Sequence, residues 1–124
     1  MLCAVLSRRA GLALQDQDVY VNVTGGVRVE EPAADLGVAL AIASAMRDKP
    51  VGKGTACFGE VGLTGDVRYV SGAPRRTTEM SKMGFGRIIR PEGTKDGPAD
   101  GGVVGGVSVV EIRTLEEAVA VALL

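Results

Sequence analysis

The 124-residue sequence contains no histidine and no tryptophan, and it has only two cysteines. Without histidine there is no Ser-His-Asp or Cys-His nucleophile, no HExxH metalloprotease motif and no Cys2His2 zinc site. A zinc site made from thiolates alone takes about four cysteines, twice the number present. The composition therefore excludes several common classes of hydrolase and predicts no metal site.

Long apolar runs are also absent, and none approaches the roughly 20 residues of a membrane-spanning helix. The apolar start (residues 1–6) has no basic residue before it and meets Arg8 and Arg9 at once, which is not the order of a secretory signal. Cys3 and Cys57 lie in apolar surroundings without CxxC spacing. We therefore expect reduced, buried thiols in a cytoplasmic protein with no membrane partner.

The formal net charge is only −1, which argues against a strongly basic nucleic-acid module, but the charge is polarised. Residues 67–90 carry six basic side chains and one acid, Glu79, whereas residues 91–124 carry two basic and six acidic side chains. The six are candidate DNA-binding residues that would contact phosphates: Arg68, Arg75, Arg76, Lys82, Arg87 and Arg90. The alternative is a solvated helix face and strand ends, because only Tyr69 and Phe85 are available there for base stacking.

Hydrophobic periodicity predicts alternating helices and strands along a single domain, residues 1–124. The predicted helices are 2–14, an alanine-rich central helix 33–46, 73–83 and 115–124, the last opened by a capping box of Thr114 and Glu117. The predicted strands are 19–24, resumed at 27–29, then 55–59 and 67–70 around the turn 62–66, 87–90 and 107–112, with a flexible glycine-rich loop at 92–106. This order predicts an α+β domain, a two-layer α/β arrangement with a mixed sheet.

Two further patterns are weak candidates for a site. The stretch 52–55 (GKGT) lacks the GxxxxGK[ST] spacing of a phosphate-binding loop. Glu30, Glu31 and Asp35 precede or open the central helix, where carboxylates compensate the helix dipole, although they are also the groups of a metal or acid-base site. We favour dipole compensation, with Asp35 kept as a candidate because it stands inside an apolar run.

Three stretches resemble a known family: VYVNVTGGVRVEEPAADLGVALAIASAMRDKP, then FGEVGLTGDVRYV, then MGFGRIIRP. They resemble the carboxy-terminal domain of the bacterial RadA (Sms) family of DNA repair and recombination ATPases. That domain is similar to the proteolytic domain of Lon, which implies a fold like ribosomal protein S5 domain 2. The resemblance also implies that a zinc finger and a RecA-like ATPase core belong to other parts of a longer chain, so ATP, magnesium and zinc are expected there and no cofactor here.

Lon-like peptidases use a serine at the start of the central helix and a lysine in the helix after the following hairpin. Aligned on EPAADLG, the serine position falls on Ala33, and the lysine position falls on Arg76. Alanine has no nucleophilic atom, and an arginine does not give up its proton to act as a base. Ser44, Ser71 and Ser81 do not match the motif position.

The resemblance therefore implies a domain that is not an enzyme. We expect a scaffold that supports a homo-oligomeric, hexameric ring and contributes weak DNA binding during branch migration. The alternative is a residual Lon-type serine peptidase, which the residues at positions 33 and 76 disfavour.

Overall fold

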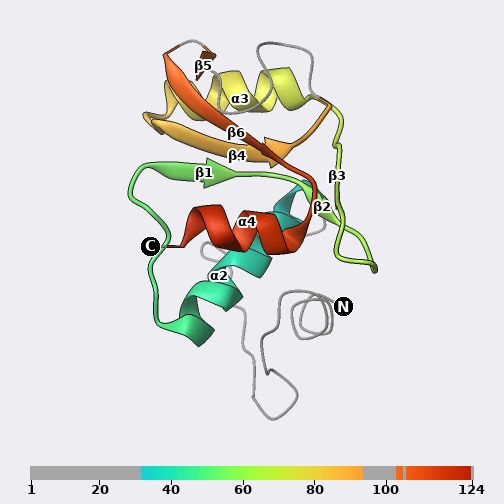
Figure 1. Cartoon of the computed structure of the whole chain (residues 1–124). Helices are drawn as coiled ribbons and strands as arrows, with labels where there is room; N and C mark the ends of the chain where they lie inside the picture. The colour runs from blue at the N-terminus through green and yellow to red at the C-terminus, as the bar shows by residue number, and fades with distance from the viewer. Residues whose placement is uncertain (1–31, 94–102, 105, 124) are drawn as a thin grey trace, which may run out of the picture.

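The computed structural model describes residues 32–93, 103–104 and 106–123 (Figure 1). The predicted helix 2–14, the predicted strand 19–24 with its continuation at 27–29, and Cys3, Glu30 and Glu31 lie outside these residues. The described part contains a four-stranded sheet, a small two-stranded sheet and helices on two sides.

The main sheet has the strand order β1 (Thr55–Cys57), β4 (Arg87–Pro91), β6 (Val107–Ile112) and β5 (Val103–Val104). The first three strands are parallel, and β5 runs antiparallel to β6, so the predicted mixed sheet is confirmed. Strand β5 was not predicted and lies inside the range 92–106 assigned to a loop. The register places Ala56, Ile88 and Val109 side by side across the sheet.

The small sheet is a hairpin of β2 (Glu60–Val61) and β3 (Val67–Arg68). The predicted turn at 62–66 is confirmed, but the predicted partner of the second strand is wrong. Residues 55–57 pair with β4 in the main sheet, and it is residues 60–61 that pair with β3. Gly59 separates the two strands at φ +156°, and a Cβ there would lie 2.7 Å from Cγ1 of Val67. The close approach explains why the chain changes sheets at a glycine.

Three α-helices are described: α2 (Asp35–Arg47), preceded by the short 3-10 turn η2 (Pro32–Ala34), α3 (Ala73–Lys82) and α4 (Leu115–Ala122). All three were predicted to within a few residues. Helix α4 begins as expected from its capping residue, because the Thr114 hydroxyl accepts a hydrogen bond from the Glu117 backbone N–H at 3.1 Å. Helix α2 ends at Arg47, and the C-cap residue Asp48 has a left-handed backbone (φ +50°), which aspartate tolerates better than most residues.

The helices lie on both faces of the main sheet, with α3 on one side and α2 and α4 on the other (Figure 1). Side chains of β4 alternate between the two sides: Ile89 packs in the cluster with α2 and α4, and Ile88 packs in the cluster with Ala73 of α3. The prediction of two layers is therefore corrected to three, because hydrophobic periodicity does not reveal which face of a sheet a helix covers.

Helix α2 has 13 residues. Among the described residues, none of the helices combines the length and apolar character needed to cross a bilayer.

Candidate functional site

The first position of the expected dyad, Ala33, lies in η2 at the start of the central helix and is 4% exposed. Its carbonyl accepts a hydrogen bond from the Gly59 N–H at 2.9 Å, and its methyl group belongs to an apolar cluster with Phe58 and Val70. The side chain therefore faces the protein interior and offers no group for nucleophilic attack.

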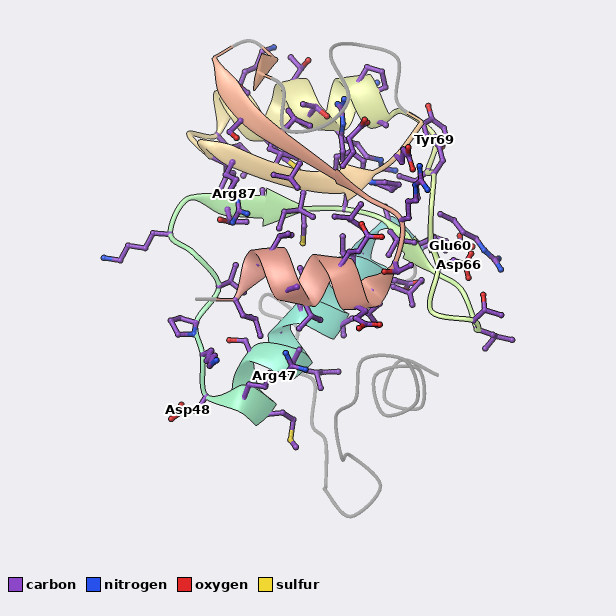
Figure 2. The ribbon with its side chains drawn as sticks, in the orientation of Figure 1. Arg47, Asp48, Glu60, Asp66, Tyr69 and Arg87 are labelled. Atoms are coloured by element: carbon purple, nitrogen blue, oxygen red, sulfur yellow. The ribbon has the colours of Figure 1, made fainter. Side chains whose placement is uncertain are left out.

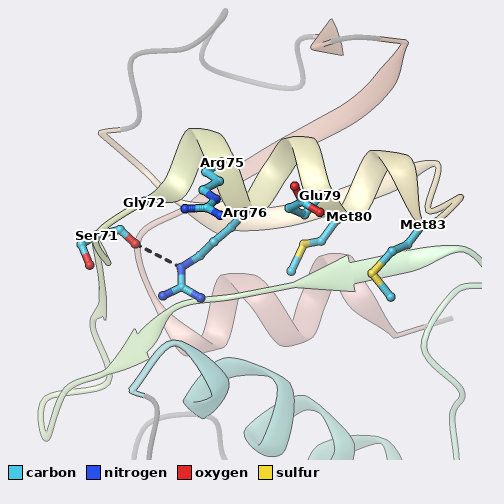
Figure 3. Close-up of a pocket in the computed structure, with 7 residues that line it drawn as sticks. All are labelled: Ser71, Gly72, Arg75, Arg76, Glu79, Met80 and Met83. Carbon is cyan, nitrogen blue, oxygen red and sulfur yellow. Dashed lines mark hydrogen bonds between the residues drawn. The ribbon is translucent and has the colours of Figure 1, made fainter.

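The second position, Arg76, lies on α3, one turn after Ala73. Ala73 and Ala33 share one apolar cluster, so the fold brings the start of α2 toward the first turn of α3. The Nε of Arg76 donates a hydrogen bond to the backbone carbonyl of Ser71 at 3.1 Å (Figure 3). The alignment thus places both dyad positions in the same region of the fold, where they carry a methyl group and a guanidinium.

A pocket of about 500 Å³ lies along α3 (Figure 3). It is lined by Ser71, Gly72, Arg75, Arg76, Glu79, Met80 and Met83. Helical spacing divides the side chains into two stripes, since residues i, i+4 and i+7 share a face. Arg75, Glu79 and Lys82 form one stripe, and Arg76, Met80 and Met83 form the other.

The six basic candidates do not form one surface. Arg90 is 0% exposed, so the prediction that it faces DNA is corrected. Arg87 is half-buried, and its Nη2 donates to the carbonyl of Val121 at 2.8 Å, which ties β4 to α4. Both arginines belong to a strand that is covered on both faces, and the sequence alone did not reveal that β4 is central.

The other candidates are more accessible. The guanidinium of Arg68 is ion-paired with Asp66 at 2.8 Å and lies 3.7 Å from Glu60. Arg75 and Lys82 are exposed on α3, and Arg76 is half-buried beside the pocket. The exposed cations of the predicted cluster are therefore concentrated on α3, with one more, already paired, on the hairpin.

A buried polar network, which sequence reasoning missed, joins α3 to the sheet. Nε of Arg90 lies 3.4 Å from Oε2 of Glu111, whose side chain is 3% exposed. Nη1 of Arg90 donates to the Thr77 hydroxyl at 3.0 Å, and that hydroxyl donates to the Ala73 carbonyl at 2.9 Å. Arg90 and Glu111 are directly opposite in the register of β4 and β6. The sequence signal that could have revealed this pair is a basic residue, Arg90, and an acidic residue, Glu111, each next to apolar residues of a strand.

Asp35 and Cys57 are the remaining candidates that lie within the described residues. Asp35 opens α2, and its Oδ2 accepts a hydrogen bond from the Val61 N–H at 3.1 Å, so this carboxylate also ties the helix to β2. Burial raises the pKa of the Cys57 thiol to about 11, so little thiolate is present near neutral pH. Within the part of the chain that the structure describes, no group of three or more potential ligands could hold a metal ion.

Comparison with known proteins gives consistent matches. A family model described as subunit ChlI of Mg-chelatase matches residues 3–94. The DNA repair protein RadA of Bacillus subtilis is 47% identical over 118 residues, which cover 92% of this chain. RadA of Listeria monocytogenes is 46% identical over 127 residues and RadA of Halalkalibacterium halodurans 43% identical over 123 residues, each match covering 99% of this chain.

The matched region is the carboxy-terminal part of RadA, so the predicted resemblance is confirmed. It makes up 26% of each of these three relatives, and the chain thus spans about a quarter of their length. Because the family model covers well over half of the sequence, the chain belongs to the family described as subunit ChlI of Mg-chelatase.

Proposed function

We propose that this chain is a non-catalytic scaffold domain of a RadA-type DNA repair protein, with the fold of a Lon proteolytic domain and of ribosomal protein S5 domain 2. The observation that carries the proposal is the buried methyl group of Ala33 at the start of the central helix. A serine hydroxyl at this position would be the nucleophile of a Lon-like peptidase. The similarity to RadA, named a DNA repair protein, supports the role in DNA repair.

The geometry around Ala33 supports the absence of peptidase chemistry. A guanidinium does not give up its proton to act as a general base, and that of Arg76 donates to a backbone carbonyl. Among the serines that do not match the motif, Ser44 lies at the far end of α2 from Ala33, and its hydroxyl donates a hydrogen bond to the Lys49 carbonyl at 2.6 Å. The backbone carbonyl of Ser71, at the pocket, accepts the hydrogen bond from Arg76.

In this proposal the domain supports assembly of a homo-oligomeric, hexameric ring and adds a weak contact to DNA in the cytoplasm. DNA contact would fall to Arg75 and Lys82, the exposed cations of α3. Glu79 stands between them on the same stripe, and its negative charge lowers the attraction for phosphate. One domain therefore binds weakly, and the ring supplies avidity. ATP, magnesium and zinc would be bound by other domains of the longer protein.

A peptidase assay tests the central proposal. The chain and its Ala33→Ser variant are incubated with unfolded casein, and we expect no cleavage by either, because Arg76 leaves a new serine without a base. The double variant with Arg76→Lys is the matched comparison that restores both groups. Cleavage by the unmodified chain that persists through repurification would refute the scaffold proposal in favour of a residual peptidase.

The DNA contact is tested by salt dependence in the complete protein that carries this chain. Arg75→Ala and Lys82→Ala should each reduce the slope of log affinity against log salt by nearly one unit. Lys53→Ala, an exposed lysine in the loop after α2, is the matched control and should leave the slope unchanged. Equal slopes in all variants would remove DNA binding from the proposed role of this domain.

A further inference from the structure

The β2–β3 hairpin presents an exposed apolar side chain at its tip. Leu63 is 73% exposed, although a leucine loses favourable apolar burial when it faces water. The turn beneath it is ordered: the Gly62 N–H donates to the Asp66 carbonyl at 2.8 Å, and the Gly65 N–H donates to the Gly62 carbonyl at 3.0 Å. The hairpin is therefore prepared to insert Leu63 into a partner with little loss of conformational entropy.

The hairpin is also anchored to the rest of the domain. The Leu115 N–H donates to the Gly65 carbonyl and the Val67 N–H to the Arg113 carbonyl, both at 2.8 Å. Asp66 accepts from the Thr64 hydroxyl at 2.6 Å as well as pairing with an arginine of β3. These hydrogen bonds fix the hairpin to the start of α4, so the tip is held in one position relative to the rest of the domain.

The pocket along α3 is a second unsatisfied apolar feature of the same chain. Met83, at the end of α3, is 73% exposed, and Met80 lies beside it on the same stripe (Figure 3). Methionine side chains adapt their shape to an inserted group. The high exposure of both Leu63 and Met83 means that this chain does not fill its own pocket with its own hairpin.

The charges of the two surfaces are complementary. Glu60 and Asp66 with Arg68 give the hairpin a net charge of −1, and Figure 2 shows Glu60 and Asp66 close together on it. The surface of the α3 pocket is basic, because Arg75 and Arg76 line it together with a single acidic residue, Glu79. Its methionine lining suits an apolar protein side chain better than a phosphate, so the partner favoured here is protein.

We infer that the α3 pocket receives the hairpin tip of a second copy of this chain, with Leu63 of one copy seated against Met80 and Met83 of the next. The two contacting surfaces differ, so the contact is heterologous, and in this proposal the rotation between neighbouring copies is one that closes a ring. The inference rests on the proposed function as a ring scaffold and names the contact that builds the ring. Its apolar part uses the methionine stripe of α3, whereas the proposed DNA contact uses Arg75, which also lines the pocket, and Lys82, which does not.

Native mass spectrometry of the complete protein tests the contact. Leu63→Ser and Met83→Ser should each weaken the association of neighbouring copies by about 10- to 100-fold, the loss expected when one buried apolar side chain becomes polar. Tyr69→Ser is the matched control, because Tyr69 is also a large, exposed side chain (52%) but lies outside the proposed contact. It should leave the ring intact.

Cross-linking between two variants tests the geometry directly. Protein with Leu63→Cys is mixed with protein with Met83→Cys and treated with a short bismaleimide, and we expect linked pairs containing one of each. Thr78→Cys replaces Met83→Cys in the control, because Thr78 is exposed on α3 but does not line the pocket. The native cysteines are common to all mixtures.

The outcomes separate the two claims. A ring that persists in Leu63→Ser and Met83→Ser, with no selective cross-link, overturns this inference and leaves the scaffold function standing. An unmodified protein that stays monomeric at all concentrations overturns both. Rings lost in these two variants but kept in Tyr69→Ser, together with the selective cross-link, establish the contact.

Discussion

The buried pair of Arg90 and Glu111 makes a strong prediction about stability. Each side chain is almost wholly withdrawn from water, and the pair lies between β4, β6 and α3. The perturbation is Arg90→Met, which keeps an apolar stem of similar length and removes the cation. The carboxylate of Glu111 then remains buried without its partner, and Thr77 loses the donor that faces its hydroxyl.

The expected magnitude follows from the asymmetry of buried ion pairs. Removing one partner of such a pair costs about 3–5 kcal/mol, because an uncompensated charge remains in a medium of low polarity. A domain of this size has a total free energy of unfolding of about 5–15 kcal/mol, so the single variant approaches the limit of folding. The double variant Arg90→Met with Glu111→Leu removes both charges and should be close to the unmodified chain, because apolar replacements of buried pairs are often neutral.

Equilibrium urea unfolding, followed by far-UV circular dichroism, measures these differences. We expect a large fall in the midpoint for Arg90→Met and recovery in the double variant at an unchanged m-value. Arg68→Met, which removes an exposed partner of Asp66, is the matched control and should shift the midpoint little. If Arg90→Met and Arg68→Met shift the midpoint equally, the buried pair does not secure α3 to the sheet and the reasoning fails.

Three further predictions concern single positions. Gly59→Ala should destabilise the domain by about 1–3 kcal/mol through the close contact with Val67, measured by the same urea titration. Burial raises the pKa of the Cys57 thiol to about 11, so this thiol should react slowly with maleimide at pH 7 in the folded chain and faster after unfolding. A mass-spectrometric time course measures both rates, and equal rates in the two states would contradict the prediction. A hydrogen bond from Thr64 and a second from Arg68 lower the pKa of Asp66, so the stability that they contribute is present above the unfolded-state pKa and is lost as the pH falls through the folded-state pKa. The variant Thr64→Val should therefore raise the pKa of Asp66 in an NMR titration, and an unchanged pKa would refute the assignment.

Much of the fold was predictable because its helices carry local signals. Helix α4 begins after a capping threonine, and α3 begins with Pro74 in its first turn and ends near Gly84. Strand β6 was predicted with the same bounds, in a segment rich in valine between a glycine pair and Thr114. These signals act within a few residues and do not depend on what lies across the sheet.

The remaining features depend on long-range pairing, which local patterns do not specify. The partner of β3 was wrong because residues 55–57 and 60–61 are both extended and only Gly59 separates them. The site was predicted less well than the fold, since arginine is usually a surface residue. Arg90 is buried because β4 is a central strand and α3 covers the face on which its side chain lies. Its partner Glu111 is 21 residues further along the chain.

The central place of β4 also governs the order in which the domain is completed. Its neighbour β6 and the helix α4 come last in the described chain, and they supply Ile112, Leu115 and Val119 to the cluster that covers α2. As the chain is synthesised from its amino terminus, the part of α2 that packs against α4 and the edge of β4 that pairs with β6 cannot make these contacts until residues 107–122 have been made. Parallel pairings between distant segments form slowly, and chains that wait with exposed apolar surface are prone to aggregate. The synthesis of the carboxy-terminal elements therefore sets the time at which a growing chain can bury this apolar surface and is no longer prone to aggregate through it.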